Sequence, residues 1–212
     1  MILYDYWRSS SAWRVRIALG CKGIPFERRV VNLAAREQDA PPFRALNPLG
    51  QVPVLVTDEG TLTQSQAILA YLEDRFPTPA LFPRAPWPRA RAIELAEMMV
   101  SGIQPLQNLS VLAYLRAAGV DDAMAVARHY NARGLAGVEI MARETAGTFL
   151  VGGELTIADV CLVPQLSSAR RFGVDVAGYP TLLRVEAACA ALPAFRNAHA
   201  DAQSDAVREP PR

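Results

Sequence analysis

The sequence has little cysteine, little histidine and no long apolar run. Its three cysteines, Cys21, Cys161 and Cys189, lie far apart without a C-x-x-C spacing, which argues against a disulfide framework or a zinc site. The two histidines, His129 and His199, are equally isolated, so ordinary helix positions are favoured over a metal site or a catalytic dyad. We therefore expect reduced, mostly buried thiols and no metal.

A membrane span, a secretory leader and an excess of one charge are also missing. No apolar run approaches the length needed to cross a bilayer, and the first residues show no charged leader before an apolar core. The 22 basic residues nearly cancel the 21 acidic ones, which argues against nucleic acid as a partner. With 212 residues, 51% of them hydrophobic, the chain can bury one large core or two modest ones. We expect a globular cytoplasmic protein of one or two domains.

The most informative stretch joins an aromatic strand to a helix through three serines. Residues 2–7 are apolar or aromatic except for Asp5, Ser9–Ser11 follow, and apolar residues within 15–19 begin a helical pattern. Free backbone N–H groups and the helix dipole at such a point favour an anion, which includes a thiolate as well as a phosphate or a carboxylate. The simpler alternative is that the serines only cap the helix. Arg14 and Arg16, inside this helix, are expected to be structural or solvent-facing.

Residues 1–78 read as a small α/β domain. After the first helix the predicted elements are strands at 26–31, 51–56 and 61–63 and a helix at 65–76. Pro53 cannot donate to a strand ladder, so it must lie at a strand start or an edge, or follow a cis bond in a tight turn. If that bond is cis, the Val52 backbone turns outward and is free to pair with a bound peptide.

A helical region follows a proline-rich connection. Five prolines within residues 77–88 indicate a linker at 79–88, and residues 89–212 contain no convincing strand. Pro105 is expected to kink or break the first helix of this domain, and Thr156–Asp159 forms a capping box. The predicted helices are 89–116, 121–144, 160–172, 181–191 and 193–199, followed by a frayed tail at 201–212.

This organisation resembles the cytosolic glutathione transferases, which implies an N-terminal thioredoxin-like domain and a C-terminal all-helical bundle. Residues 9–16, SSSAWRVR, resemble the signature of the zeta class, which includes the maleylacetoacetate isomerases. Residues 103–112 resemble a second stretch of that class, and residues 156–159 match the capping box of the superfamily. The similarity covers roughly residues 1 to 200. Ser11 replaces the cysteine of the signature, as in the related bacterial maleylpyruvate isomerases, which leaves the substrate open.

The resemblance implies glutathione as a cofactor and assigns it a site. Ser10 is the first choice as the hydroxyl that donates to the sulfur, with Ser9 and Ser11 behind it. The Val52 backbone would pair with the cysteinyl residue of glutathione as an added strand. The other implied cofactor contacts are Gln51 at the glycyl end, Gln64 and Ser65 at the γ-glutamyl carboxylate, and Gln104 and Asn108 on one face of a helix.

Two arginines complete the implied site. A maleyl keto acid carries two carboxylates, and a planar guanidinium binds a carboxylate through paired donors. Arg8 borders the serine loop, and Arg171 falls where the resemblance implies a substrate-binding arginine. The implied activity is glutathione-dependent cis-trans isomerisation, and the implied assembly is a homodimer. Two alternatives stay open, namely a zeta-like transferase acting on α-halo acids or other small electrophiles, and a non-catalytic interaction module.

Overall fold

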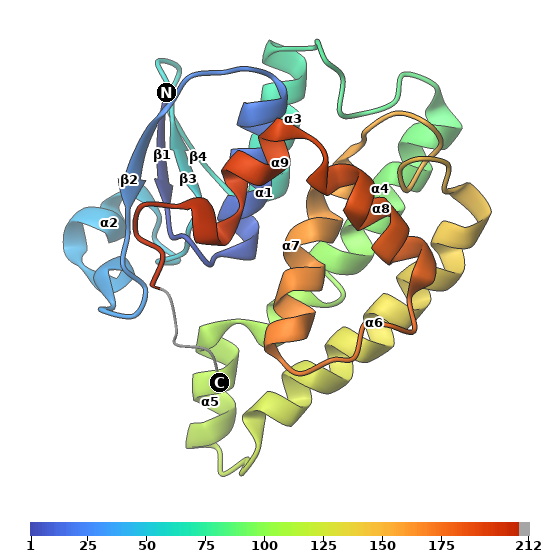
Figure 1. Ribbon diagram of the computed structural model, residues 1–212. Coiled ribbons are helices and arrows are strands. Elements are labelled where there is room, and N and C mark those ends of the chain that lie inside the picture. The colour runs from blue at the N-terminus through green and yellow to red at the C-terminus, as the bar shows by residue number, and fades with distance from the viewer. Residues whose placement is uncertain (208–212) are drawn as a thin grey trace. The chain divides into compact units, whose positions relative to one another are not determined.

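The computed structural model describes residues 1–207 and divides the chain into two compact units (Figure 1). The first unit consists of Met1–Ala80 together with the chain from Ala191 onward. The second unit is Leu81–Ala190. The first unit is therefore built from two stretches that are distant in the sequence.

The first unit is a thioredoxin-like α/β fold, as predicted. Its four strands lie in the order β2-β1-β3-β4, with β1 and β2 parallel and the other two pairs antiparallel. The predicted strand at 51–56 is shorter in the structure, because pairing begins only after Pro53, which has no N–H to donate. The elements are β1 (Ile2–Asp5), α1 (Ser10–Cys21), β2 (Glu27–Val30), η1 (Glu37–Asp39), α2 (Pro41–Leu46), β3 (Val54–Val56), β4 (Thr61–Thr63), α3 (Ser65–Arg75), α9 (Pro193–Ala198) and η3 (Ala200–Ala202).

Alternating side chains on the strands bury both faces of this sheet. Leu3 and Leu55 are opposite one another in the ladder, and both are fully buried. Tyr4 and Val54 face the other way, and Phe43 of α2 packs against them. The sheet is thus a packed middle layer, and its strand pairing determines where the loops at the strand ends lie.

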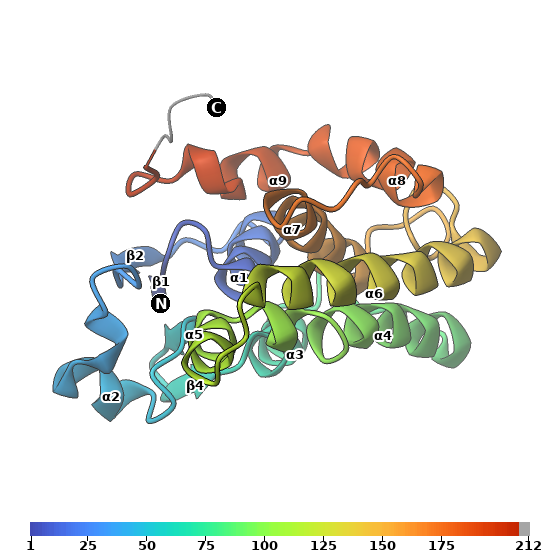
Figure 2. The ribbon, with the colours of Figure 1, turned by 90° about the horizontal axis from the view of Figure 1, so that it is seen from below.

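The second unit is helical throughout, apart from an isolated bridge between Ala146 and Gly152. For residues 89–116 the sequence predicts one long helix or a broken pair, and the structure shows the broken pair, with a short 3₁₀ turn between the two helices. The break falls at residues 101–103, before Pro105, which is the second residue of the 3₁₀ turn, where its missing N–H does no harm. The elements are α4 (Pro86–Val100), η2 (Gln104–Gln107), α5 (Leu109–Ala117), α6 (Ala123–Thr145), α7 (Ile157–Arg171) and α8 (Pro180–Ala190), of which α4 and α6 run side by side in Figure 2.

The predicted capping box at the start of α7 is confirmed. The carboxylate of Asp159 is fully buried and accepts hydrogen bonds from Thr156 N (2.7 Å), Thr156 Oγ1 (2.9 Å) and Leu150 N (2.8 Å). Burial raises the pKa of Asp159 to about 6, against the pull of these donors. Asp159 therefore joins the preceding loop to the first turn of α7.

A second buried carboxylate, Glu139 of α6, joins that helix to the start of α8. It accepts hydrogen bonds from Thr181 N (3.3 Å), Leu182 N (3.1 Å) and the Arg143 guanidinium (3.0 Å). Burial opposes ionisation, but these donors outweigh it and hold the pKa of Glu139 below its ordinary value.

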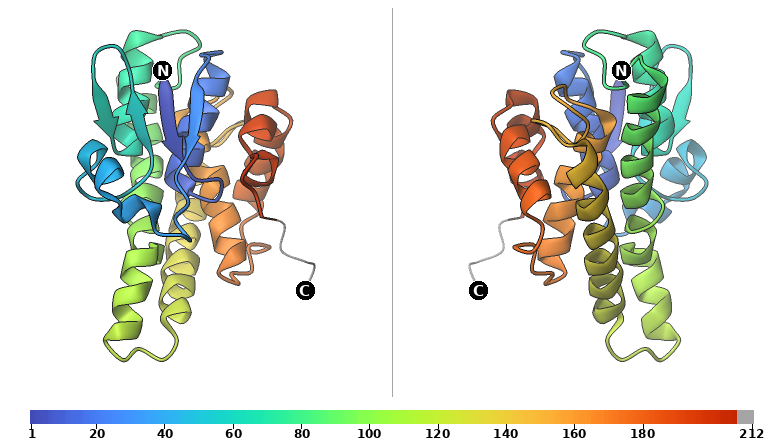
Figure 3. Two further views of the ribbon diagram at one scale, coloured as in Figure 1. Left: turned by 90° about the vertical axis from the view of Figure 1, so that its left-hand side faces the viewer. Right: turned by 90° about the vertical axis from the view of Figure 1, so that its right-hand side faces the viewer.

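The chain after α8 returns to the first unit, and Figure 3 shows α9 lying along α1. Ala194 of α9 approaches so closely that a Cβ at Gly20 of α1 would lie 3.3 Å from its Cβ. The prediction of a frayed tail at 201–212 is wrong for its first part, because η3 and Asp205 pack on the first unit through side-chain contacts. Residues 208–212 of that predicted tail lie outside the described residues. Within residues 1–207 we find no helix long and apolar enough to cross a membrane.

Candidate functional site

Strand register brings three predicted site segments to one end of the sheet. Tyr4 of β1 is opposite Val54 of β3, and Val54 is opposite Thr63 of β4. Since both pairs are antiparallel, the chain leaving β1, the chain entering β3 and the chain leaving β4 meet at the same end. These are the serine loop, the Gln51–Val52 segment and the Gln64–Ser65 segment.

The serine loop leads directly into the N-terminus of α1. Ser9 is the N-cap, and its Oγ accepts a hydrogen bond from Ala12 N at 3.3 Å. Ser10 is the first helical residue and is buried, whereas Ser11 is partly exposed. Ser9 thus fits the simpler capping role, and Ser10 and Ser11 lie in the first turn, where the helix dipole favours an anion.

The segment before β3 contains the cis bond that the sequence analysis gave as one alternative for Pro53. The Val52–Pro53 peptide bond is cis, and ladder pairing starts only at Val54. The carbonyl oxygen of Gln51 accepts a hydrogen bond from the Asn47 side chain at 2.7 Å, which holds this segment in place. The peptide groups of Val52 therefore lie beyond the ladder, where an added extended peptide can pair with them.

The N-terminus of α3 forms the third side of the site. Gln64 is exposed and has a φ of 68°, an unusual conformation for a residue other than glycine, and Ser65 begins the helix. Arg14 of α1 is fully buried and donates from Nη1 to Ser65 Oγ at 3.3 Å. The structural role expected for Arg14 and Arg16 is confirmed, while the solvent-facing alternative is wrong, since both are buried. Arg14 ties together the two helices whose N-termini frame the site.

Arg8 is the substrate-binding candidate of the first unit. It lies within the loop between β1 and α1, with its guanidinium 5.2 Å from the centroid of the buried Trp7 ring. This contact holds the cation beside the serines that follow it in the chain. The first unit therefore gathers hydroxyls, helix N-termini and one arginine at a single end of its sheet.

The second unit carries the remaining candidates. Gln104 begins η2, whereas Asn108 is the extended N-cap residue of α5. The prediction that these two share one helix face is wrong, because the chain leaves the 3₁₀ turn between them. Arg171 ends α7, with its guanidinium 4.9 Å from the ring centroid of Phe172.

A buried cluster of side-chain amides fixes η2, and the sequence analysis missed it. Gln107 Oε1 accepts from Asn131 Nδ2 (2.8 Å) and Gln165 Nε2 (3.3 Å), and Gln165 Nε2 also donates to Asn131 Oδ1 (2.6 Å). All three side chains are buried. They join η2, α6 and α7, and only the polarity of positions on otherwise apolar helix faces hinted at them.

The three cysteines of the chain lie outside the serine loop. Burial raises the pKa of the Cys21 thiol to about 11, and Cys161 and Cys189 are buried. Among residues 1–207, no group of three or more histidine, cysteine or acidic residues is placed to hold a metal ion. The serine loop itself contains no cysteine.

Comparison with known proteins shows that two domain models of one family match this chain. The family model "Glutathione S-transferase, N-terminal domain" matches residues 1–74, and "Glutathione S-transferase, C-terminal domain" matches residues 137–193. Maleylacetoacetate isomerase of Rattus norvegicus is 44% identical over 98% of this chain and 96% of its own length.

Two solved structures are similar over nearly the whole chain. A maleylacetoacetate isomerase from Anaeromyxobacter dehalogenans, with dicarboxyethyl glutathione and citrate bound in its active site, is 51% identical with a TM-score of 0.88, covering 97% of each chain. A maleylpyruvate isomerase described as a bacterial zeta-class glutathione S-transferase is 40% identical with a TM-score of 0.95, covering 98% of this chain and 100% of its own.

Proposed function

The chain belongs to the glutathione S-transferase family, and within it to the zeta class with the maleylacetoacetate isomerases; on this premise we propose that it is a glutathione-dependent cis-trans isomerase of a maleyl keto acid. The observation that carries the proposal is the meeting of the serine loop, Val52 and the start of α3 at one end of the sheet.

The residues at this end of the sheet fit glutathione. A tripeptide needs an exposed backbone to pair with, donors for its γ-glutamyl carboxylate and donors for its sulfur. Val52 offers the backbone, Gln64 and Ser65 offer side-chain and helix N-terminal donors, and Ser10 offers the hydroxyl for sulfur. Gln51 lies one residue before Val52, which suits the glycyl end.

Bound glutathione supplies a thiolate that adds reversibly to the cis double bond, so that rotation about the resulting single bond and release give the trans isomer. A free cysteine-type thiol has a pKa of about 8.5, so only a few per cent is ionised at neutral pH. Ser10 stabilises the thiolate by hydrogen bonding from the positive end of α1, with Ser9 and Ser11 as the neighbouring hydroxyls.

Arginines of the two units bind the substrate's carboxylates. Arg8 lies in the serine loop and Arg171 at the end of α7, and each guanidinium can grip a carboxylate through paired N–H donors. Gln104 and Asn108, at η2 and at the start of α5, remain the proposed glutathione contacts of the second unit. The sequence-derived domains at 1–78 and 89–212 differ from the two units of the structure at the C-terminal end, because the chain from Ala191 onward belongs to the first unit.

The assembly and location that we propose are a homodimer in the cytoplasm. Trp87 is 75% exposed and Ile93 is 38% exposed, both on α4, and exposed large apolar side chains of this kind favour a second copy of the chain as a partner. Light scattering after size exclusion tests the assembly directly.

Assay with catalytic glutathione separates the proposal from its alternatives. Maleylpyruvate and maleylacetoacetate should be converted in many turnovers by a trace of glutathione that is recovered unchanged. A transferase acting on dichloroacetate would show its main activity there, and a non-catalytic module would show none. Isomerisation at a rate no greater than that of glutathione alone refutes the proposal.

Point variants test the assigned roles. Ser10→Ala should lower kcat about a hundredfold through loss of a donor to the developing charge, with the exposed Ser110→Ala as a matched control. Arg171→Ala should raise KM roughly tenfold to a hundredfold, since a hydrogen-bonded contact to a charged group is worth about 1.5–3 kcal/mol. Arg170→Ala, which loses only a partly exposed pair with Glu186, is its control.

A further inference from the structure

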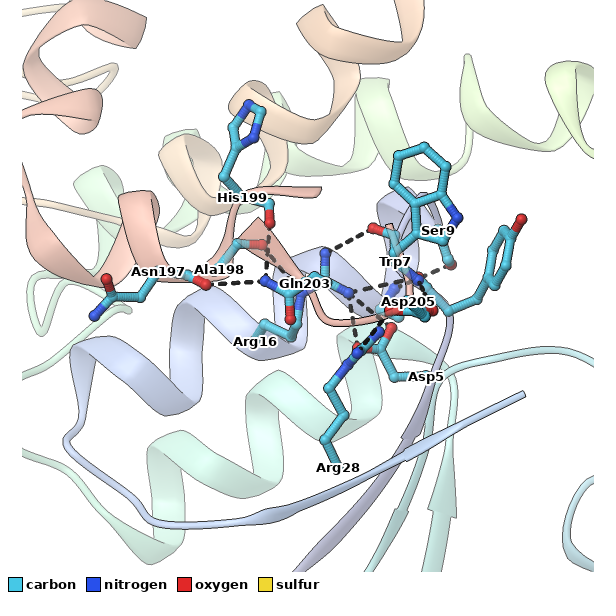
Figure 4. A network of polar contacts seen from close by, with 12 residues as sticks. Asp5, Trp7, Ser9, Arg16, Arg28, Asn197, Ala198, His199, Gln203 and Asp205 are labelled. Atoms are coloured by element: carbon cyan, nitrogen blue, oxygen red, sulfur yellow. Dashed lines mark hydrogen bonds and ion pairs between the residues drawn. The ribbon is translucent and has the colours of Figure 1, made fainter. Parts of the chain in front are cut away.

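The C-terminal segment holds the serine loop by a contact that joins residues 198 positions apart. Trp7 N donates a hydrogen bond to Asp205 Oδ2 at 3.1 Å (Figure 4). Trp7 begins the loop that carries Ser9–Ser11, and its side chain is buried. Asp205 is thus the last described acidic residue of the chain and touches the backbone of the proposed thiolate site.

The carbonyl oxygen of Trp7 is also held by a hydrogen bond. Arg16 Nη2 donates to Trp7 O at 2.9 Å, and Arg16 Nε donates to Ala198 O at 3.1 Å. Arg16 therefore binds the serine loop and the C-terminal segment at once. The turn is closed by Ser9 N, which donates to Tyr6 O at 2.9 Å.

Two aspartates and two arginines form one ion cluster behind this turn. Asp5, fully buried at the end of β1, accepts from Arg16 Nη1 (2.7 and 2.8 Å) and from Arg28 Nε (2.6 Å). Arg28 Nη1 also lies 2.7 Å from Asp205 Oδ1. Figure 4 shows the cluster lying between the serine loop and the C-terminal segment. Arg28 therefore orients the carboxylate that accepts the Trp7 N–H.

We propose that Asp205 is a positioning residue for glutathione activation, which it serves by fixing the Trp7 peptide and hence the serine hydroxyls that follow. This inference rests on the proposed function. Hydrogen bonds weaken steeply with distance and angle, so a donor to sulfur is effective only on a backbone that is held in place. The residues that bind the rest of glutathione, Val52, Gln64 and Ser65, lie outside this loop. Loss of Asp205 should therefore impair ionisation of the thiol more than binding of the tripeptide.

Asp205 is also the member of the cluster best suited to mutation. Asp5 and Arg16 are almost completely buried, and removing one partner of a buried pair leaves an uncompensated charge that threatens folding. The side chain of Asp205 is 15% exposed, at the rim of the cluster. Asp205→Asn keeps an oxygen for Trp7 N while removing the charge opposite Arg28, and Asp205→Ala removes both.

The experiment measures thiol ionisation and tripeptide binding separately. Thiolate absorbance of glutathione bound to the full chain, followed against pH, gives the thiol pKa, and titration with S-methylglutathione, which has no thiol, gives a Kd. Asp205→Ala should raise the bound thiol pKa by about one unit and lower kcat about tenfold. The Kd for S-methylglutathione should change less than about twofold, and Asp205→Asn should fall between Asp205→Ala and wild type. Asp201→Ala, on the same segment but exposed, should behave as wild type.

The outcomes distinguish failure of the positioning role of Asp205 from failure of the proposed function. A thiol pKa in Asp205→Ala equal to that of wild type overturns the positioning role. Parallel loss of S-methylglutathione binding also overturns it, since the residue would then support the whole site. A wild-type protein that leaves the bound thiol at its free pKa refutes the proposed function instead. If Asp205→Ala does not fold, the isosteric Asp205→Asn decides by the same criteria.

Discussion

Replacing Asp159 by alanine tests the junction at the start of α7. The substitution removes the acceptor for Leu150 N, Thr156 N and Thr156 Oγ1, all inside the core of the second unit. Leu150 is fully buried and Thr156 is 1% exposed, so water cannot replace the lost acceptor. Two backbone N–H groups are then left unsatisfied, while the threonine hydroxyl can rotate to another partner.

The magnitude follows from these two donors and from the charge. An unsatisfied buried donor costs about 1–3 kcal/mol, so the loss of the acceptor for two of them should lower the free energy of unfolding of Asp159→Ala by about 2–6 kcal/mol. The pKa of Asp159, raised from 3.8 to about 6 by burial, adds a pH dependence. The folded state binds this proton more tightly than the unfolded state, so the wild type gains stability as pH falls through that range, up to roughly 3 kcal/mol.

Urea denaturation at pH 7 and pH 5, followed by circular dichroism, measures both effects. The gap in stability between wild type and Asp159→Ala should widen at pH 5, because only the wild type carries the titrating carboxyl. Asp121→Ala, an exposed acidic residue of the same unit, serves as the control and should show no gap. A difference in unfolding free energy below about 1 kcal/mol would show that the donors find other acceptors in the variant. A difference that becomes smaller at pH 5 would show that the folded state favours the ionised carboxylate.

Three further perturbations examine the packing and electrostatics of the second unit. A Cβ at Gly134 would lie 2.3 Å from Ile103 Cγ1, so Gly134→Ala should lose about 1–3 kcal/mol in urea denaturation, whereas Gly153→Ala, with open space around it, should be neutral. Asn131→Leu removes a partner from two buried glutamines and should lower the melting temperature, with η2 showing faster hydrogen exchange than the rest of the unit. Glu139→Gln should destabilise the protein at pH 7 but not at low pH. The pKa of Glu139 is lowered in the folded state, so its carboxylate stabilises the fold at pH values above its ordinary pKa, and this stabilisation is lost on acidification. A difference in stability between wild type and variant that stays the same at low pH would contradict this.

Local sequence signals predicted the framework of both units. The turn before Thr61–Thr63, the helix start at Ser65 and the capping box at Thr156–Asp159 depend on neighbouring residues, and all three are present. The serine loop was found for the same reason, since a strand, hydroxyls and a helix start are contiguous in the chain. Contacts between the segments at the sheet end then follow from register.

Features that depend on distant residues were not predictable in this way. Gln104 and Asn108 lie on different elements, because η2 ends at Gln107. Buried amides of α6 and α7 hold Gln107, and no local pattern connects them to it. Asp205 resembles any polar residue near a chain end, and only the fold brings it to Trp7. The burial of Arg14 was missed because its partner, Ser65, lies on another helix.

The two-part composition of the first unit has a consequence for biosynthesis. Residues 1–80 emerge from the ribosome before Ala191 and Asp205 are synthesised. The sheet of the nascent chain therefore at first lacks α9 and the ion pair between Arg28 and Asp205. The loop that we assign to thiol activation therefore gains its final support only when translation is nearly complete. A chain that stops short of Asp205 would carry Arg8 and the three serines but lack the carboxylate that accepts the Trp7 N–H.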